Sequence, residues 1–440
     1  MNPRYELWRR ITFGITWLIY ATFYFTRQAF DIAKPAFEGS AVSLTRDEMG
    51  RVNSVYSTVY MLGQFAFGSL GDKYGPRIVL LFGIALSVFA AIVGGFSLTF
   101  WTFIILAVLQ GVAQSTGWSN VNKTMSAWFS LRERGRVVGW WCTCYSLGPA
   151  IALMFGGAMM RLFSSERTDA DGAPQVVEYW PAAFWSAAAV LGVVGVLAWF
   201  LLRDRPEDLG LPSIEQYHGE PESLLDDESP AEPAPEGSSA IIREVLSSPS
   251  IWLLAISYFC VKLTRYVFIF WGPLYVKESL GSDASTSAFT AAAMPIGGVV
   301  GVIAIGYVSD LLFQSRRAPA AMLSLLATAG VLLVGLTQLE SAWAMAAFFF
   351  CVGAFLFGPD SVISATASMD FGTKRGAGTA IGFVNGVGSI GGIFGGFLPG
   401  MLTKGDDWSP LFRVLLIGLV LSACVLSPLW RRKPPAAKTA

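Results

Sequence analysis

Long runs of hydrophobic residues, separated by short polar segments, fill the chain from residue 11 to residue 430. A helix that spans the hydrocarbon core of a bilayer needs about 20 predominantly apolar residues, and stretches of that kind recur about twelve times. They lie near residues 11–33, 52–71, 78–97, 100–128, 137–162, 180–202, 251–276, 286–309, 319–338, 341–367, 377–402 and 409–430. The pattern predicts an all-α membrane protein with about twelve transmembrane helices.

One polar segment, residues 203–248, is much longer than the others. It contains GEPESLLDDESPAEPAPEGSS, which is acidic, rich in proline and serine and free of aromatic residues. Such a composition does not bury enough apolar surface to fold. We therefore expect a disordered cytoplasmic linker at 203–248, between an N-terminal six-helix half (1–202) and a C-terminal six-helix half (249–440).

The two halves repeat polar residues at a constant separation. Three pairs of identical residues are 238 positions apart: Tyr20 and Tyr258, Arg27 and Arg265, and Asp72 and Asp310. In secondary transporters, parallel repeats of this kind enclose a substrate site near the bilayer midplane. The repeat thus predicts two pseudo-symmetric halves that share one site.

Composition excludes several other classes of protein. Hydrophobic residues make up 53% of the chain and charged residues 14%, against about 25% charged in soluble domains. The net charge of +0 gives no basis for a nucleic-acid partner. The five cysteines lie in apolar stretches, and the single histidine, His218, lies in the linker, so we expect no disulfide framework, no metal and no cofactor. No nucleophile–base pair is visible, so we expect no enzymatic activity.

Basic residues predict the orientation. They concentrate in the segments on the same side as the termini, for example Arg132, Arg134 and Arg136. By the positive-inside rule, these segments face the cytoplasm. We expect a monomeric multi-pass protein of the plasma membrane (a bacterial inner membrane), with both termini cytoplasmic and the lipid bilayer as its surroundings.

Two of the predicted spans carry aligned polar side chains. Spacings of three and four residues place these side chains on one face of each helix: Tyr20, Tyr24, Arg27 and Asp31 in the first span, and Tyr258, Lys262 and Arg265 in the seventh. A charge at membrane depth costs about 2.5–3.5 kcal/mol on insertion scales, so it persists where it is paired or lines a wet pathway. We predict that Arg27, Lys262 and Arg265 bind an anion, and the planar fork of arginine favours phosphate.

A structural alternative is that these cations are neutralised by carboxylates within the spans. Asp31 and Asp360 are the main candidates. Asp360 could pair with Lys262 or with Lys123, either as a structural pair or as a coupling element.

The loop after the second span reads GSLGDKYGPR, from Gly68 to Arg77, and a weaker copy ends at Asp310. It resembles the G-x-x-x-D-x-x-G-R-[KR] signature of the major facilitator superfamily. The resemblance implies a conformational latch that includes Asp72, Arg77 and Asp310. The alternative is a simple charged loop.

A narrower resemblance begins in the fourth span, in QGVAQSTGWSNVNKTMSAWFSLRERGRVVGWW. This segment resembles the organophosphate:phosphate antiporter family, and so do YATFYFTRQAF, KLTRYVFIFWGPLY, RDRPEDLGLP and KRGAGTAIGF, so the resemblance covers nearly the whole chain. It implies the major facilitator fold, with Arg27 and Arg265 as paired phosphate-binding arginines. It also implies substrate contacts from Tyr20, Tyr24 and Trp118.

The chain departs from this family at positions near the expected substrate. Family members carry a lysine where this chain has Gln64, and the glycerol-phosphate transporter has a histidine at what corresponds to Tyr145. We count Gln64 and Tyr145 among the substrate-binding residues. The resemblance therefore supports a phosphate site and leaves the organic part of the substrate open.

These features predict a secondary active transporter. It would exchange a phosphorylated organic anion, such as a sugar phosphate, glycerol phosphate or a similar ester, for inorganic phosphate by alternating access. Two alternatives stay open. One is a non-transporting phosphate-ester sensor of the same fold, and the other is a proton-coupled organic anion transporter, for which Asp31 and Asp360 are the candidate acids.

Overall fold

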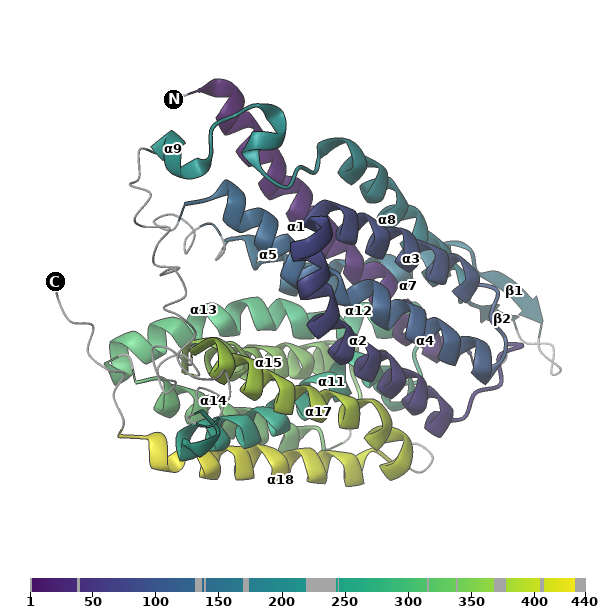
Figure 1. Cartoon of the computed structure of the whole chain (residues 1–440). Helices are drawn as coiled ribbons and strands as arrows, with labels where there is room; N and C mark the ends of the chain where they lie inside the picture. The colour runs from purple at the N-terminus through teal and green to yellow at the C-terminus, as the bar shows by residue number, and fades with distance from the viewer. Residues whose placement is uncertain are drawn as a thin grey trace. The chain divides into compact units, whose positions relative to one another are not determined.

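The computed structural model of the protein is almost entirely helical (Figure 1). It describes residues 2–37, 40–130, 137, 140–168, 174–218, 243, 245–314, 316–337, 339–367, 377–403 and 407–431. The chain forms two compact units. Unit 1 comprises Met1–Ser43 and Thr58–Pro235, and unit 2 comprises Leu44–Ser57 and Glu236–Ala440.

Unit 1 contains the helices from the first half of the sequence. They are α1 (Pro3–Ala33), the later part of α2 (Arg46–Tyr74), α3 (Pro76–Gly94), α4 (Phe100–Ser115), α5 (Gly117–Trp128), α7 (Cys144–Leu162), α8 (Pro181–Leu201) and α9 (Ile214–His218), with 3-10 turns η1 (Lys34–Ala36) and η2 (Pro206–Leu209). Proline begins α3 and α8, at a position where its missing N–H has no helical partner to lose. α1 packs against α7 and α8, and α3 packs against α4 and α8.

A short antiparallel hairpin joins α7 to α8. Its strands are β1 (Ser165–Thr168) and β2 (Pro174–Val177), and Ser165 pairs with Val177. The sequence did not predict these strands, because four residues are too few for an alternating pattern to be recognised.

Unit 2 contains the start of α2 and the helices of the second half. They are α11 (Pro249–Leu280), α12 (Ala284–Ala291), α13 (Ala293–Phe313), α14 (Arg317–Val334), α15 (Ala342–Ser361), the π-helical segment η4 (Val362–Ala367), α17 (Ala377–Leu402), α18 (Ser409–Leu426) and the 3-10 turn η5 (Ser427–Leu429). α11 packs along α17 and α18, and α13 packs along α15. α14 contacts both α15 and α18.

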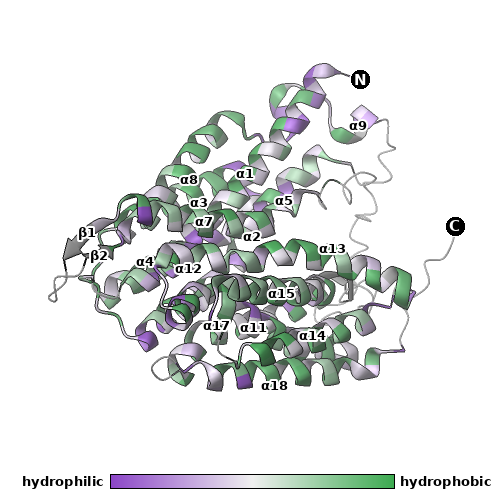
Figure 2. Ribbon diagram, turned by 180° about the vertical axis from the view of Figure 1, so that it is seen from behind, coloured by the Kyte–Doolittle hydropathy of each residue, from purple (hydrophilic) through white to green (hydrophobic). Residues whose placement is uncertain are grey.

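Most of the predicted spans satisfy the requirements for crossing a membrane. Within the described residues, nine helical segments are long and apolar enough to do so, and Figure 2 shows the hydrophobic colour along α14 and α18. The remaining predicted spans (11–33, 52–71 and 137–162) coincide with α1, α2 and α7, which are long helices of more polar composition. The helical membrane fold is confirmed, and the count of twelve spans stays a prediction.

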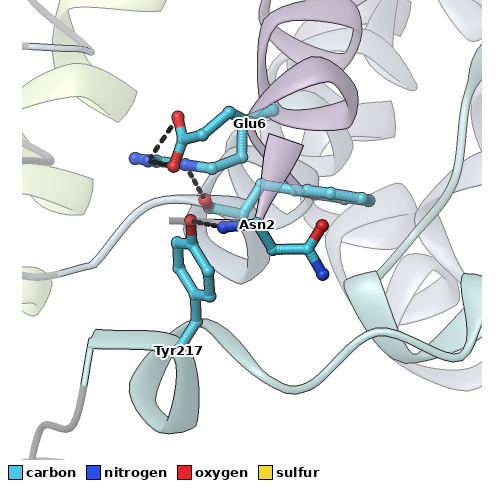
Figure 3. A network of polar contacts seen from close by, with 5 residues as sticks. Asn2, Glu6 and Tyr217 are labelled. Atoms are coloured by element: carbon cyan, nitrogen blue, oxygen red, sulfur yellow. Dashed lines mark hydrogen bonds and ion pairs between the residues drawn. The ribbon is translucent and has the colours of Figure 1, made fainter. Parts of the chain in front are cut away.

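Part of the predicted linker is ordered, contrary to our expectation for 203–248. Residues 203–218 include η2 and α9, and α9 packs on the start of α1 (Figure 3). The Asn2 backbone N–H donates to the Tyr217 hydroxyl at 3.1 Å, and the rings of Tyr5 and Tyr217 stack with centroids 3.9 Å apart. These contacts supply the apolar burial that composition alone did not indicate. Residues 219–242 lie outside the described part of the chain.

The start of α2 is fixed to the rest of unit 2 through Arg46. One guanidinium nitrogen of Arg46 lies 2.7 Å from Oε1 of Glu278, and another donates to the Thr403 hydroxyl at 3.1 Å. The Trp408 indole donates to the other oxygen of Glu278 at 2.8 Å. Close backbone packing accompanies these bonds, since a Cβ added to Gly400 would lie 2.7 Å from the Arg46 carbonyl oxygen. Glycine is therefore needed at this helix crossing.

Candidate anion-binding site

In unit 1, the polar face of α1 places a cation on two aromatic rings. Arg27 is half-buried, and its guanidinium carbon lies 5.4 Å from the ring centroid of Tyr24 and 4.7 Å from that of Tyr60. Both distances fall within the range of a cation–π interaction. Tyr24 comes one turn before Arg27 on α1, as its spacing predicted, whereas Tyr60 comes from α2. The two rings pack against the guanidinium, a side chain that also stacks on aromatic faces where it recognises anions.

Four of the predicted aromatic residues gather beside this arginine. The Tyr20 ring lies 5.8 Å from the Tyr24 ring and 5.5 Å from the Trp118 ring, and Tyr24 lies 6.5 Å from Tyr145. Tyr20 and Tyr24 are buried, whereas Tyr145 is half-buried and Trp118 is exposed. The four rings thus form one cluster, to which α1 contributes Tyr20 and Tyr24, α5 contributes Trp118 and α7 contributes Tyr145.

Two other predicted residues of unit 1 lie on α2 and α5. Gln64 is exposed on α2, and Lys123 is half-buried on α5. Tyr60, which sequence reasoning missed, precedes Gln64 by one helical turn. That spacing on the same face of α2 was the available signal.

In unit 2, Arg265 is part of a buried ion pair. Its Nη1 donates to Oδ2 of Asp360 on α15 at 2.7 Å, and both side chains are only 6% exposed. The guanidinium carbon also lies 4.3 Å from the ring centroid of Phe357, one turn earlier on α15. The sequence analysis did not single out Phe357, although its spacing from Asp360 is helical.

Lys262 lies one turn before Arg265 and has different neighbours. Its ammonium group donates to the Ser389 hydroxyl on α17 at 3.2 Å and lies 5.1 Å from the ring centroid of Tyr258. Lys262 is half-buried and Tyr258 is buried. Each unit therefore holds a half-buried cation against a tyrosine ring of the same helix.

Both candidate carboxylates contact a cation. Asp360 pairs with Arg265, and its predicted pairing with Lys262 or Lys123 stays a prediction. Asp31, the other candidate partner, lies 2.6 Å from the ammonium of Lys34. The structural alternative therefore holds for Arg265, through Asp360. Sequence spacing could not show this, because the pairing depends on how α15 is rotated against α11.

Comparison with known proteins decides the family. The model of the Major Facilitator Superfamily matches residues 16–396. The protein belongs to the major facilitator superfamily. It is 30% identical to the membrane sensor protein UhpC of Escherichia coli, over 99% of this chain and 95% of that protein. It is 26% identical to a probable hexose phosphate transport protein of Chlamydia trachomatis, over 98% of this chain and 92% of that protein.

A solved structure shares the fold. A bacterial homologue of the human lysosomal transporter Spinster, in an inward-facing and unoccupied conformation, matches with a TM-score of 0.70 at 16% sequence identity. The match covers 98% of this chain and 96% of that one, and it concerns the fold alone. Together the comparisons confirm the resemblance to the organophosphate:phosphate antiporter family. The protein is a multi-pass membrane protein and not an enzyme.

The superfamily signature loop is anchored within unit 1. Gly75 has a φ of 87°, which favours glycine, and the N–H of Arg77 donates to Oδ1 of Asp204 at 2.7 Å. The Arg77 guanidinium donates to the carbonyl of Trp199 at 2.6 Å. Burial raises the pKa of the Asp204 carboxyl above its ordinary value, although the N–H of Arg77 opposes this shift. Asp204 thus caps α3 from the segment that follows α8.

The two acidic residues of the signature are only partly described. Asp72 lies near the end of α2 and Asp310 near the end of α13, and their side chains lie outside the described part of the structure. Their role as a latch, together with Arg77, stays a prediction. Within the described residues, no group of three His, Cys, Asp or Glu side chains could hold a metal ion.

Proposed function

We propose that this protein carries a phosphorylated organic anion, such as a sugar phosphate or glycerol phosphate, across the membrane in exchange for inorganic phosphate. Transport would proceed by alternating access in a bacterial inner membrane, with both termini in the cytoplasm. Relatives of nearly full length support the substrate class, since one is named as a probable hexose phosphate transport protein.

The observation that carries the proposal is an arginine at the same repeat position in each unit. Arg27 and Arg265 are 238 residues apart, and each guanidinium lies against an aromatic ring, that of Tyr60 or that of Phe357. A guanidinium held in this way presents a planar pair of donors that matches phosphate oxygens. Because Arg265 and Asp360 are nearly closed to solvent, phosphate would reach Arg265 as neighbouring side chains move apart.

Charge supports exchange rather than one-way transport. Of the charged residues assigned to the binding site, Arg27, Lys262 and Arg265 are cations, and Asp360, which pairs with Arg265, is an acid. Removing a net positive site from water is costly unless an anion compensates it. A bound phosphate or phosphate ester supplies that compensation, so the site returns to the other side loaded with a second anion.

A flux assay with purified protein in liposomes tests the proposal. Liposomes loaded with inorganic phosphate should take up labelled phosphate, and external phosphate esters should compete with it. The same esters should raise the Tm of the detergent-solubilised protein, because ligand that binds only the folded state stabilises it. If phosphate and a panel of esters produce neither stabilisation nor flux, the proposal is wrong.

A sensor of phosphate esters is the second candidate, and the similarity to a membrane sensor protein favours it. Both candidates share the binding residues and differ in the transport step. Stabilisation by esters without flux, at matched protein density in the liposomes, would assign the sensor function.

A further inference from the structure

One carboxylate oxygen of Asp360 accepts no hydrogen bond from the described residues. Oδ2 accepts from Arg265 at 2.7 Å, whereas Oδ1 is buried and has no hydrogen-bond partner among the described residues. Asp360 is only 4% exposed. Buried polar atoms in proteins nearly always have a partner, so an exception calls for an explanation. A carboxylate only accepts hydrogen bonds, so the partner that fits Oδ1 is a donor.

The backbone around Asp360 is irregular. Pro359 lies inside α15, and the π-helical segment η4 begins two residues after Asp360. Proline removes a helical hydrogen bond, and π-helical segments in other proteins are frequent at functional sites. An ionisable residue at membrane depth is also a functional candidate by default. These features mark Asp360 as more than a neutralising partner for Arg265.

We propose that Asp360 selects the protonated form of the substrate's phosphoryl group. When a phosphoryl oxygen accepts from Arg265, a P–OH of the same group donates to Oδ1 of Asp360. A phosphate monoanion has such a proton. A fully deprotonated phosphoryl group has no P–OH, and sulfate at neutral pH has no acidic proton either. Each of them would place a negatively charged oxygen next to Oδ1 of Asp360, and the two would repel each other. The inference rests on the proposed function and specifies the ligand's protonation state.

Few other titratable groups compete with Asp360 for this role. α12 and η4, which pack against α15, carry none, and α14 carries only Arg317. α13 carries Tyr307, which is exposed, and Asp310, whose side chain is not described. The charged residues of α11 are Arg265 itself, Lys262, whose ammonium group contacts Ser389, and Lys277 and Glu278, which lie more than three turns beyond Arg265. α15 itself adds Cys351, two and a half turns before Asp360.

Ligand competition on the full-length purified protein tests the selection. Inorganic phosphate should bind the wild type on the order of 100-fold more tightly than inorganic sulfate, because a site built around a ligand hydroxyl rejects the analogue that lacks it. In Asp360→Asn, the amide oxygen still accepts from Arg265 while the NH2 donates to a deprotonated oxygen. The phosphate preference should then fall to within about tenfold.

A pH series provides a second readout that needs no variant. For glycerol phosphate, the apparent Kd of the wild type should rise about tenfold for each pH unit above the second phosphate pKa of about 6, as the monoanion is depleted. In Asp360→Asn this slope should vanish. Asp360→Glu, which keeps the carboxylate, should keep the slope even if its affinity is lower.

Asp31→Asn is the matched control. It removes the same charge from the other buried pair, Asp31 with Lys34, and should keep both the sulfate discrimination and the pH slope. Equal binding of phosphate and sulfate by the wild type, or a Kd independent of pH, overturns the role of Asp360 while leaving phosphate binding intact. If the wild type binds neither phosphate nor glycerol phosphate, the proposed function itself fails.

Discussion

Arg27 and Arg265 occupy the same repeat position but have different surroundings. Arg27 is half-buried against Tyr24 and Tyr60, whereas Arg265 is buried and paired with Asp360. A substitution at Arg27 tests phosphate binding in unit 1. A substitution at Arg265 also leaves Asp360 as a buried charge without its partner, so its effect on folding must be separated from its effect on binding.

Replacing Arg27 by Gln should weaken phosphate binding by about 10- to 100-fold, because hydrogen bonds to charged groups contribute about 1.5–3 kcal/mol. Arg27→Lys should recover only part of the loss, since an ammonium cannot reproduce the planar fork. The phosphate affinity is measured from the shift in Tm on adding phosphate. The Tm without ligand shows whether each variant is folded. Affinity of Arg27→Gln within twofold of wild type would remove Arg27 from the site.

The corresponding control in unit 2 is a double variant. Arg265→Gln alone should destabilise the protein by about 3–5 kcal/mol, as the loss of one partner of a buried pair does elsewhere. Adding Asp360→Asn removes the remaining charge and should restore much of the Tm without restoring phosphate binding. Recovery of binding in the double variant would show that Arg265 does not contact phosphate.

At the scale of residues, the sequence predicted which side chains belong to the candidate site better than which side chains they contact. The aromatic cluster of Tyr20, Tyr24, Trp118 and Tyr145 could be anticipated from helical spacing and from the family resemblance. Several cations stayed open as the partner of Asp360, because periodicity fixes which face of a helix is polar but not which residue of a neighbouring helix lies opposite. The spacing of Tyr60 from Gln64 placed it on the predicted polar face of α2, but not against Arg27.

At the scale of single helices, α2 is unusual because its two ends belong to different units. Leu44–Ser57 belongs to unit 2, and the rest of the helix belongs to unit 1. A hydrogen-bonded group holds the first turn of α2, and it consists of Arg46, Glu278, Thr403 and Trp408. Glu278 is the centre of this group, since it accepts from both Arg46 and Trp408.

Glu278→Gln should lower the free energy of unfolding by about 1–3 kcal/mol, because it weakens two hydrogen bonds to a partly buried carboxylate. Asp47→Asn is the control. It breaks the ion pair between Arg51 and Asp47, whose side chains are 62% and 43% exposed, and exposed pairs contribute only about 0–1 kcal/mol. Thermal unfolding of both variants in one detergent gives the comparison. Equal Tm values would show that the Arg46 group does not stabilise the start of α2.

Helix positions were predictable from hydrophobic length, since each predicted span falls on one helix or on two consecutive helices of the described residues. The connections were less predictable. The segment at 203–218 looked polar and unstructured, yet Tyr217 stacks on Tyr5 at a distance of more than 200 residues in sequence. Contacts between such distant positions leave no periodic signal in a single sequence.

At the scale of the whole molecule, the repeat relates the two units. Tyr24 and Lys262 are separated by the same 238 positions as Arg27 and Arg265, so a tyrosine in one unit corresponds to a cation in the other. The charges proposed to bind substrate are therefore unequal, with one cation in unit 1 and two in unit 2. A bound anion would compensate these charges, which is the physical basis proposed for coupled exchange.

Exchange should consequently be obligatory. Liposomes loaded with phosphate should take up labelled phosphate, whereas empty liposomes should not, because the cationic site does not return without an anion. Neither an inward proton gradient nor a membrane potential should replace internal phosphate. The proton-coupled alternative requires a carboxylate that releases and binds a proton during transport, but Asp31 and Asp360 are each engaged with a cation, at 2.6 Å and 2.7 Å. Proton-driven uptake into empty liposomes would contradict obligatory exchange, and its loss in Asp360→Asn but not in Asp31→Asn would assign the coupling to Asp360.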